Sequence, residues 1–295
     1  MFCNRRQQSG IALLMAILVV VAATAISVSM IHDEAFMIRK TSRVQLLDRA
    51  RLYALGLEDW ARVMLKRDRD DSEVDDLSEG WAAGVPGLPI EAGYLAGFMQ
   101  DEQAKINLNS LLDSEESVKR LTRLCNNLDV DPVFIPALLD WIDEDLDVRY
   151  PDGAEEHYET YRVANRKMAD ASELLLVKNV TAEMYQQLKP YITALPTTTG
   201  ININTMSETV FMALGEDLNS DAFLQEREEE AFSSVQQFVE RLQIPVEEAE
   251  LVVSTEYFLA TGQVVQGDLE YNFETLIHRN NEGVTAVISR TLGLF

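Results

Sequence analysis

A short basic stretch followed directly by a long apolar one begins the chain. Arg5 and Arg6 precede Gly10, and residues 11–31 carry no charged side chain. A helix rises about 1.5 Å per residue, so such a segment spans the roughly 30 Å hydrocarbon core of a bilayer. A removable signal peptide needs only about 7 to 15 apolar residues before its cleavage site. The pattern therefore predicts a leader over 1–10, cut between Gly10 and Ile11, and a retained transmembrane helix over 11–31.

The charges on either side of this span predict its orientation. The two arginines come before it, whereas Asp33 and Glu34 follow it. By the positive-inside tendency, the arginines before the span predict the N-terminus in the cytoplasm and the bulk of the chain across the membrane. The alternative is a conventional signal peptide that is cut after Ala25, at an A-x-A site over 23–25.

The helical pattern continues beyond the span. Small and apolar side chains recur every three or four residues from Leu47 to Met64, and no proline occurs before Pro86. This predicts one continuous helix over 11–66. We expect the stripe Leu47–Met64 to contact other helices, with about half of its residues on the protein's own sheet. The acidic run 68–79 and the Gly/Pro-rich stretch 80–89 are expected to form a solvated loop.

The rest of the chain alternates between two patterns. Period-two alternation predicts strands at 94–99 and 104–109 and again near the end, and spacing of three and four predicts short helices between them. This order predicts an α+β fold in which an all-α domain is inserted into a small antiparallel sheet domain. The later strands are expected at 257–265, 269–277 and 284–290, and the helices at 118–124, 132–142, 172–177, 182–191, 207–214 and 235–242.

Two segments of similar sequence lie in this part of the chain. Residues 106–111 are INLNSL and residues 201–206 are ININTM. In each, the hydroxyl residue, Ser110 or Thr205, is expected to cap the helix that follows. A tandem repeat and a chance similarity of short amphipathic segments both account for this likeness.

Composition restricts the function. The chain has 25 basic and 49 acidic residues, a net charge of −24, and such a surface repels phosphate backbones and argues against nucleic-acid binding. The three histidines are dispersed, and no nucleophile elbow, zinc-binding helix or P-loop occurs, so no enzyme is predicted. Cys3 would leave with the leader, which makes Cys125 a buried lone thiol.

Together these features resemble the K-type minor pseudopilins of bacterial type II secretion systems, over the whole chain. A prepilin-like leader alone is typical of any pilin-like protein, whereas the leader with a large helical insertion is specific to the K type. The resemblance is carried by the junction of Gly10 and Ile11 with its long helix, and by residues 101–109, 140–145, 153–155, 161–166 and 201–205.

The resemblance implies a single-pass protein of the bacterial inner membrane with its bulk in the periplasm, cut by a prepilin peptidase and N-methylated at Ile11. It implies that the protein starts or caps the tip of the periplasmic pseudopilus, which serves the export of folded proteins across the outer membrane. The implied partners are the I- and J-type minor pseudopilins, the major pseudopilin and the inner-membrane assembly platform.

The fifth residue after the predicted cut supports a place at the tip. Most pilin-like proteins carry Glu there, which is thought to neutralise the N-terminal ammonium of a neighbouring subunit in apolar surroundings, where an unpaired charge is costly. This chain has Met15 instead. K-type proteins share the departure, and the resemblance therefore makes Met15 a marker of the fibre tip.

An acidic cluster is the best candidate for a metal site. Clustered carboxylates repel one another unless a cation or solvent intervenes, and Ca²⁺ takes six to eight oxygen ligands. The spacing is not that of an EF-hand, and from composition alone a solvated acidic loop is the simpler interpretation. K-type proteins are similar in binding calcium in the helical domain, which implies a Ca²⁺ site that uses Asp140, Asp143, Asp145 and Glu155. The other acids of the cluster are Asp147, Asp152 and Glu156.

Residues 174–188 are similar to a helix-hairpin-helix unit. DNA-binding versions have Gly in the hairpin so that backbone N–H groups can approach a phosphate, but residues 178–180 are Lys-Asn-Val. We therefore expect the hairpin to pack on protein. A DNA-uptake pilin-like adaptor remains the alternative function.

The predicted domains are the leader 1–10, the span 11–31, its continuation 32–67, the pilin-like sheet domain 68–109 with 254–295, and the inserted helical, SAM-like domain 110–253.

Overall fold

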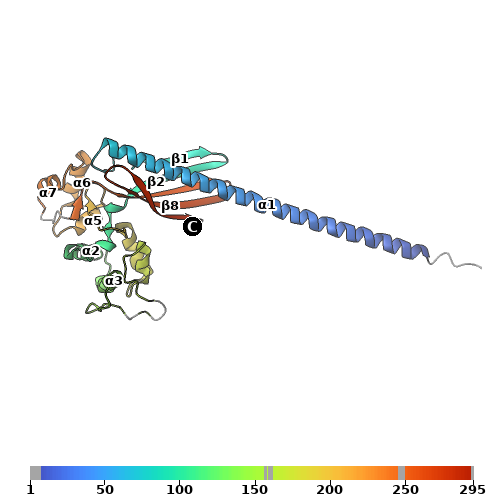
Figure 1. Cartoon of the computed structure of the whole chain (residues 1–295), viewed down its shortest axis with the longest axis horizontal. Helices are drawn as coiled ribbons and strands as arrows, with labels where there is room; N and C mark the ends of the chain where they lie inside the picture. Colours follow the sequence, from blue (N-terminus) through green and yellow to red (C-terminus); the bar gives the residue numbers. More distant parts are fainter. Residues whose placement is uncertain (1–7, 156–157, 159–161, 245–249, 294–295) are drawn as a thin grey trace, which may run out of the picture.

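One helix, α1 (Gln8–Asp71), runs most of the length of the molecule. The computed structural model describes residues 8–155, 158, 162–244 and 250–293, so residues 1–7 of the predicted leader lie outside it. The first half of α1 extends away from the rest of the chain, and its second half lies along a sheet (Figure 1). Within the described part, α1 is the one helix long and apolar enough to cross a bilayer. The predicted continuous helix is confirmed, although it ends at Asp71 rather than near residue 66.

A five-stranded antiparallel sheet covers one side of α1, in the strand order β1-β2-β7-β8-β9. The three C-terminal strands confirm the predicted ones. The strands are β1 (Val85–Ile90), β2 (Gly93–Asp101), β7 (Tyr257–Gln266), β8 (Leu269–Arg279) and β9 (Thr285–Gly293).

Strand β1 corrects the prediction of a loop over 80–89. It is an edge strand, so its two prolines, Pro86 and Pro89, need no ladder hydrogen bond on the open side. The pairing with β2 is irregular between Val85 and Leu88, as expected where proline interrupts the ladder.

Helix α1 approaches the sheet closely because two strand positions lack a side chain. A Cβ at Gly97 would lie 2.2 Å from Leu57 Cδ2, and one at Gly262 would lie 2.9 Å from the same atom. Ala50, Ala54 and Leu57 are buried at this contact. The stripe Leu47–Met64 thus packs on the protein's own sheet along its length, which corrects the expectation that about half of it contacts partner helices.

The helical part lies at the end of the molecule opposite the free half of α1 (Figure 1). All six predicted helical segments are present: 172–177 is a 3-10 helix, 132–142 and 182–191 each combine an α-helix with a 3-10 turn, and the other three are α-helices. A further helix, α6, was not predicted because its polar sequence buries only Phe223. The helices are α2 (Glu115–Asn127), α3 (Ile135–Ile142) after η3 (Pro132–Phe134), η4 (Ala171–Leu176), α4 (Ala182–Leu188) with η5 (Lys189–Tyr191), α5 (Glu208–Ala213), α6 (Ser220–Glu229) and α7 (Val235–Leu242).

Two short parallel strand pairs hold the helical part together. β3 (Ile106–Asn107) pairs with β4 (Ile192–Thr193), and β5 (Ile201–Asn202) pairs with β6 (Leu251–Val252). The predicted strand over 104–109 was correct only at Ile106–Asn107, since 102–104 and 108–110 form 3-10 turns. All of residues 106–109 are buried, and Ile106 and Leu108 belong to the core of the helical part.

The two similar segments form the same hydrogen bonds, which favours a tandem repeat over chance similarity. Asn109 Oδ1 accepts from the N–H of Met168 (2.8 Å) and its amide donates to the carbonyl of Met168 (2.9 Å). Asn204 does the same with Phe232, at 2.9 and 3.0 Å. Each asparagine side chain therefore forms two hydrogen bonds with the backbone of one residue in a distant segment, as a peptide group of a neighbouring strand does. Its burial costs little free energy because its amide and its oxygen are hydrogen-bonded.

Candidate metal site and interaction surfaces

A buried carboxylate, Asp140, organises the acidic cluster at the end of α3. Its oxygens accept hydrogen bonds from the backbone N–H groups of Arg149 (3.2 Å) and Ala154 (2.8 Å) and from the Arg149 guanidinium (3.2 Å). Gly153 makes room for this contact, since a Cβ there would lie 2.3 Å from Asp140 Oδ2. Asp140 therefore fixes the loop over 143–154, and its oxygens are already partnered.

Three buried oxygens beside this loop have no hydrogen-bond partner among the described residues: Asp143 Oδ1, Glu155 Oε1 and Asn165 Oδ1. The Asn165 amide donates to Glu155 Oε2 (3.3 Å) and to the main-chain oxygen of Asp145 (2.6 Å). Burial raises the pKa of Asp143 and of Glu155, and neighbouring carboxylates raise both further. Unpartnered buried oxygens are costly, and carboxylate and amide oxygens are ligands that Ca²⁺ takes.

The four predicted ligands therefore differ in what they offer. Asp143 and Glu155 have free oxygens, Asp140 is engaged by the loop, and the exposed Asp145 side chain accepts from the N–H of Asp147 (2.8 Å). The Arg149 guanidinium contacts both Asp140 and Asp143. Asn165 is not among the predicted ligands, although it lies in the segment 161–166 that carried the family resemblance. Glu156 lies outside the described residues.

A second group of acids, from the run 68–79, surrounds an arginine. Ligand oxygens of Asp68, Asp75 and Glu79 lie within 4.8 Å of one another. The buried Arg279 guanidinium donates to Asp75 (2.5 and 2.7 Å) and to Asp68 (2.8 Å). Burial raises the pKa of Asp68 to about 7. The expectation of a solvated loop over this run was therefore wrong for 68–71, which belong to α1, and at Asp75 and Glu79. Arg279 from β8 pairs with Asp68 and Asp75, and Glu79 accepts from the indole N–H of Trp81 (2.8 Å).

Asp101, at the end of β2, joins the sheet to the second of the two similar segments, residues 201–206. The Asp101 carboxylate is buried and accepts from the Asn202 amide (2.9 Å), the Thr205 hydroxyl (2.5 Å), the Thr255 hydroxyl and the N–H of Gln103 (2.7 Å). Burial raises the pKa of Asp101 to about 6. The hydroxyl of Thr205, predicted to cap a helix, serves this junction instead, and Ser207 caps α5.

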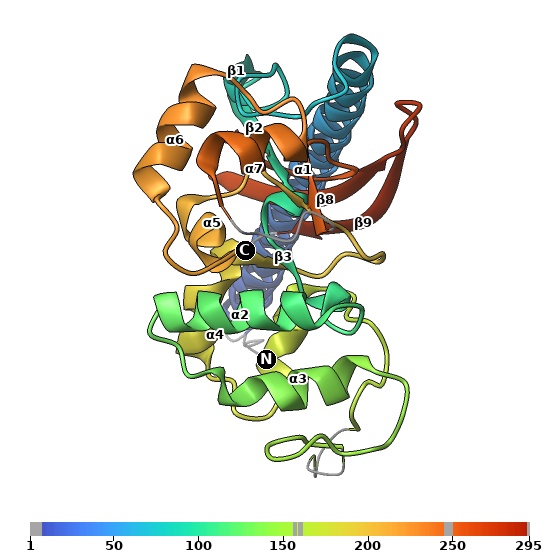
Figure 2. The same cartoon turned by 90° about the vertical axis from the view of Figure 1, so that its left-hand side faces the viewer.

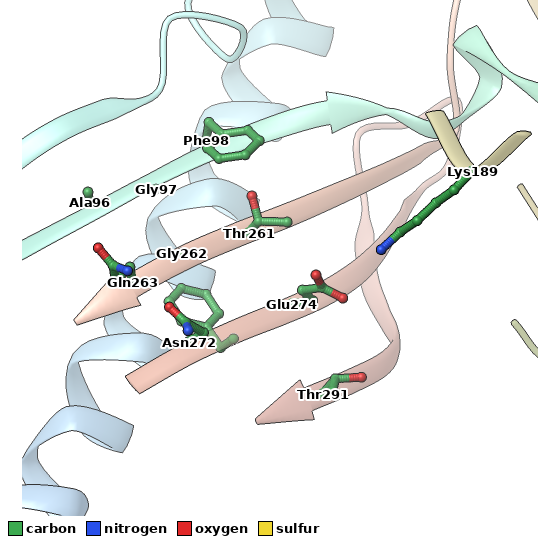
Figure 3. Close-up of a pocket in the computed structure, with 11 residues that line it drawn as sticks. Ala96, Gly97, Phe98, Lys189, Thr261, Gly262, Gln263, Asn272, Glu274 and Thr291 are labelled. Carbon is green, nitrogen blue, oxygen red and sulfur yellow. The ribbon is translucent and has the colours of Figure 1, made fainter. Parts of the chain in front are cut away.

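An open groove of about 730 Å³ crosses the face of the sheet that α1 does not cover. Phe98 of β2, Thr261 and Gln263 of β7, and Glu274 of β8 line it, with Lys189 of η5 at one end (Figure 3). Phe98 is half exposed in this groove.

The hairpin between η4 and α4 packs on the protein itself. The N–H of Lys178 donates to the Tyr158 hydroxyl (3.1 Å), and its ammonium donates to the carbonyl of Gly153 (3.3 Å). Leu174 and Val177 are buried in the core. These contacts support the interpretation that the hairpin packs on protein, here on the rest of the same chain. Cys125 is buried and unpaired, as predicted, and burial raises the pKa of its thiol to about 12.

The residues of the predicted processing site lie on the free part of α1. Gly10, Ile11 and Met15 are all exposed, and the part of α1 that contains them extends away from the other described elements (Figure 1). A Cβ at Gly10 would meet no atom within 4 Å. The geometry leaves this end of the chain open to other proteins.

Comparison with known families agrees with the two repeats. The family described as "Type II secretion system (T2SS), protein K" matches residues 104–197 and 201–254. The first match encloses the pair β3 and β4, and the second encloses β5 and β6. Each matched unit thus contains one of the two similar segments, with its buried asparagine Asn109 or Asn204.

Relatives extend the likeness to the whole chain. Type II secretion system protein K of Pseudomonas aeruginosa is 31% identical and aligns over 98% of this chain and 94% of its own length. The protein of the same name from Klebsiella pneumoniae is 29% identical, over 99% and 98%. A chain in the crystal structure of the GspK-GspI-GspJ complex from the enterotoxigenic Escherichia coli type 2 secretion system superposes with a TM-score of 0.79. It is 27% identical and covers 87% of this chain and 100% of that one.

These comparisons confirm the predicted K-type resemblance and the absence of an enzymatic role, and they give no support to the DNA-uptake alternative. The chain belongs to the protein K family of type II secretion systems and is a minor pseudopilin.

Proposed function

We propose that this pseudopilin starts or caps the tip of the periplasmic pseudopilus, in a complex with I- and J-type minor pseudopilins. The position of the helical part carries the proposal. It lies at the end of the molecule farthest from the free half of α1, and in the view from that end α7 stands in front of the sheet while α2 and α3 extend to one side of it (Figures 1 and 2). A subunit of this shape blocks the stacking of another subunit above it. The related complex of GspK with GspI and GspJ supports the choice of partners.

The fibre itself tests this proposal. Pseudopili assembled with this protein and its I- and J-type partners should carry an antibody label against the helical part at one end only, and the three proteins should purify together. Label along the length of the fibre would contradict a tip location.

The same proposal places α1 in the inner membrane as a single span, with the N-terminus in the cytoplasm. The length and apolar character of residues 11–31 support it, as does the exposed position of each of these residues. Prepilin peptidase would cut before Ile11 and the new N-terminus would be methylated. The major pseudopilin and the assembly platform would be the further contacts of α1 during fibre growth.

The missing carboxylate at position 15 gives a testable consequence. A Met15→Glu protein offers the pairing with a neighbour's N-terminal ammonium that the natural residue does not, so we expect it to occur along the fibre as well as at its end. Immunogold labelling measures its distribution. Met15→Gln is the control, because it is polar but uncharged and should stay at the tip. A Met15→Glu protein confined to the tip would show that residue 15 does not set the location.

We further propose that the helical domain binds Ca²⁺ beside α3. The unpartnered oxygens of Asp143, Glu155 and Asn165 support the site, with the main chain and side chain of Asp145 next to them. Asp140 and Gly153 would position the loop. Bound Ca²⁺ would neutralise the mutual repulsion of these acids and tie the loop over 143–154 to the segment that contains Asn165.

Thermal unfolding tests the calcium site. A ligand that binds only the folded state at about 100 times its Kd stabilises it by roughly 2.7 kcal/mol, so millimolar Ca²⁺ should raise the Tm and a chelator should lower it. The Asp143→Asn/Asp145→Asn protein should lose this response and keep or improve its metal-free stability, since acid repulsion is relieved. Because Ca²⁺ competes with protons for carboxylates whose pKa is raised, the response should shrink as the pH is lowered toward 5.

A matched control separates the site from general acidity. Asp129→Asn/Asp131→Asn removes two exposed acids from the same helical part and should leave the response to Ca²⁺ intact. Identical melting curves of the wild-type protein in Ca²⁺ and in chelator would make the cluster a solvated acidic loop.

A further inference from the structure

The stretch of α1 between the predicted span and the sheet carries three basic side chains, of which Arg39 donates to the main-chain oxygen of Ala35 (3.2 Å). Arg39, Lys40 and Arg43 are exposed and form no ion pair with any carboxylate in the described part of the chain. The sheet first contacts α1 near Leu46, and Arg49 pairs with Glu91 of the nearest turn (3.3 Å). This basic group stands out in a protein whose net charge is −24.

The three side chains lie on one side of the helix. Positions 39 and 43 are one turn apart, as are 40 and 43. Arg39 and Arg43 precede Ala50 and Ala54 by about three turns, so they lie on the side of α1 that faces the sheet farther along. They therefore lie on α1 between the predicted span and the first contact of the helix with the sheet near Leu46. We call Arg39, Lys40 and Arg43 the basic recess.

Distances along the helix place the basic recess at the level of lipid headgroups. If the hydrocarbon core ends at Ile31, Arg39 is about 12 Å above it and Arg43 about 18 Å, at 1.5 Å per residue. Helical side chains tilt toward the N-terminus, which is the membrane side here, and long basic side chains extend toward the interface. Arg39 and Lys40 therefore reach the headgroup layer, and Arg43 lies within about one Debye length of it.

Two acids lie closer to the boundary and weaken the attraction without cancelling it. Glu34 is two and a half turns before Arg43, on the opposite side of the helix. Asp33 is on the same side as Lys40, two turns below it. The face toward the sheet keeps a positive balance from Arg39 and Arg43.

Resting on the proposed membrane anchoring of α1, we infer that the basic recess binds the headgroups of anionic phospholipids in the periplasmic leaflet. The lipids hold the globular part upright over the membrane until the subunit enters the fibre. Charge complementarity selects this ligand, because phosphate groups of the leaflet are the negative charges that lie at this level of the helix.

Lipid selectivity tests the inference on the full-length protein. The protein is reconstituted in vesicles of phosphatidylcholine that contain spin-labelled phosphatidylglycerol or spin-labelled phosphatidylcholine. We expect a preference for phosphatidylglycerol of roughly fivefold at low salt, the effect of one basic residue near the surface, declining toward one in 0.5 M NaCl. Arg39→Gln/Lys40→Gln/Arg43→Gln should abolish the preference. The control Arg51→Gln/Lys66→Gln/Arg67→Gln removes the same charge farther along α1 and should keep it.

The outcomes that contradict the inference are distinct. A wild-type protein that enters the bilayer without preference, or a basic-recess variant that retains it, overturns the inference and leaves the proposed anchoring standing. Failure of the protein to enter vesicles overturns both. If the variant keeps its lipid preference but loses the complex with the I- and J-type proteins, the basic recess serves a protein partner instead.

Discussion

Gly10→Ala should leave the first ten residues on the protein in a host that has a prepilin peptidase. The wild-type chain is expected to begin at Ile11 in the mature form, so the variant would be about 1 kDa heavier and would accumulate unprocessed in the membrane. The structural cost of the change is small, since a Cβ at Gly10 meets no atom within 4 Å and alanine favours helix over glycine by about 1 kcal/mol. The loss would therefore reflect recognition of the cleavage site and not misfolding.

Gly56→Ala is the matched control for this experiment. Gly56 is also an exposed glycine of α1 with nothing within 4 Å of its Cβ position, but it lies far from the predicted cut. Its protein should be processed like the wild type. N-terminal sequencing and mass spectrometry of the membrane fraction give the readout. A mature wild-type chain that begins at Ile26 in the soluble fraction would contradict the retained span and would indicate a conventional signal peptide.

Sequence patterns predicted the elements whose burial is regular. The stripe of small residues on α1 and the period-two alternation of β8 each follow one face of one element, so neighbouring residues carry the signal. The edge strand β1 was not predicted, because Pro86 and Pro89 are typical of a loop. A strand tolerates two prolines here because β1 lies at the edge of the sheet.

Pairings between distant residues were not predictable in the same way. The acidic run 68–79 was predicted to be solvated because Arg279, which pairs with Asp68 and Asp75, is 204 residues beyond Asp75 in the sequence. In the candidate metal site, the family resemblance implied Asp140, Asp143, Asp145 and Glu155 as ligands, but the engagement of Asp140 by the loop and the position of Asn165 depend on how the loop folds. The asparagine motifs were visible as a repeat, whereas their partners Met168 and Phe232 share no obvious pattern.

The pairing of Arg279 joins three parts of the fold. Besides Asp68 and Asp75, the guanidinium donates to the carbonyl oxygens of Leu65 (3.2 Å) and Thr255 (3.0 Å) and lies 4.8 Å from the centre of the Phe258 ring. The end of α1, the loop after it and the strands β7 and β8 thus meet at one cation. Asp75 in turn accepts from the N–H of Thr255 (2.7 Å), which fixes the loop against the sheet.

Arg279→Met should lower the free energy of unfolding by about 3 to 5 kcal/mol, because it leaves buried carboxylates without their cation. The loss should be largest near pH 8 and recover as the pH falls toward 5. Burial already raises the pKa of Asp68 to about 7, and without the guanidinium the folded state would bind protons that the unfolded state does not, so acid favours folding. Urea denaturation in mild detergent at several pH values measures the effect. Arg49→Met removes an arginine from the exposed pair with Glu91 and should cost less than about 1 kcal/mol at every pH. A loss for Arg279→Met that does not change with pH would assign it to packing on Phe258 rather than to charge.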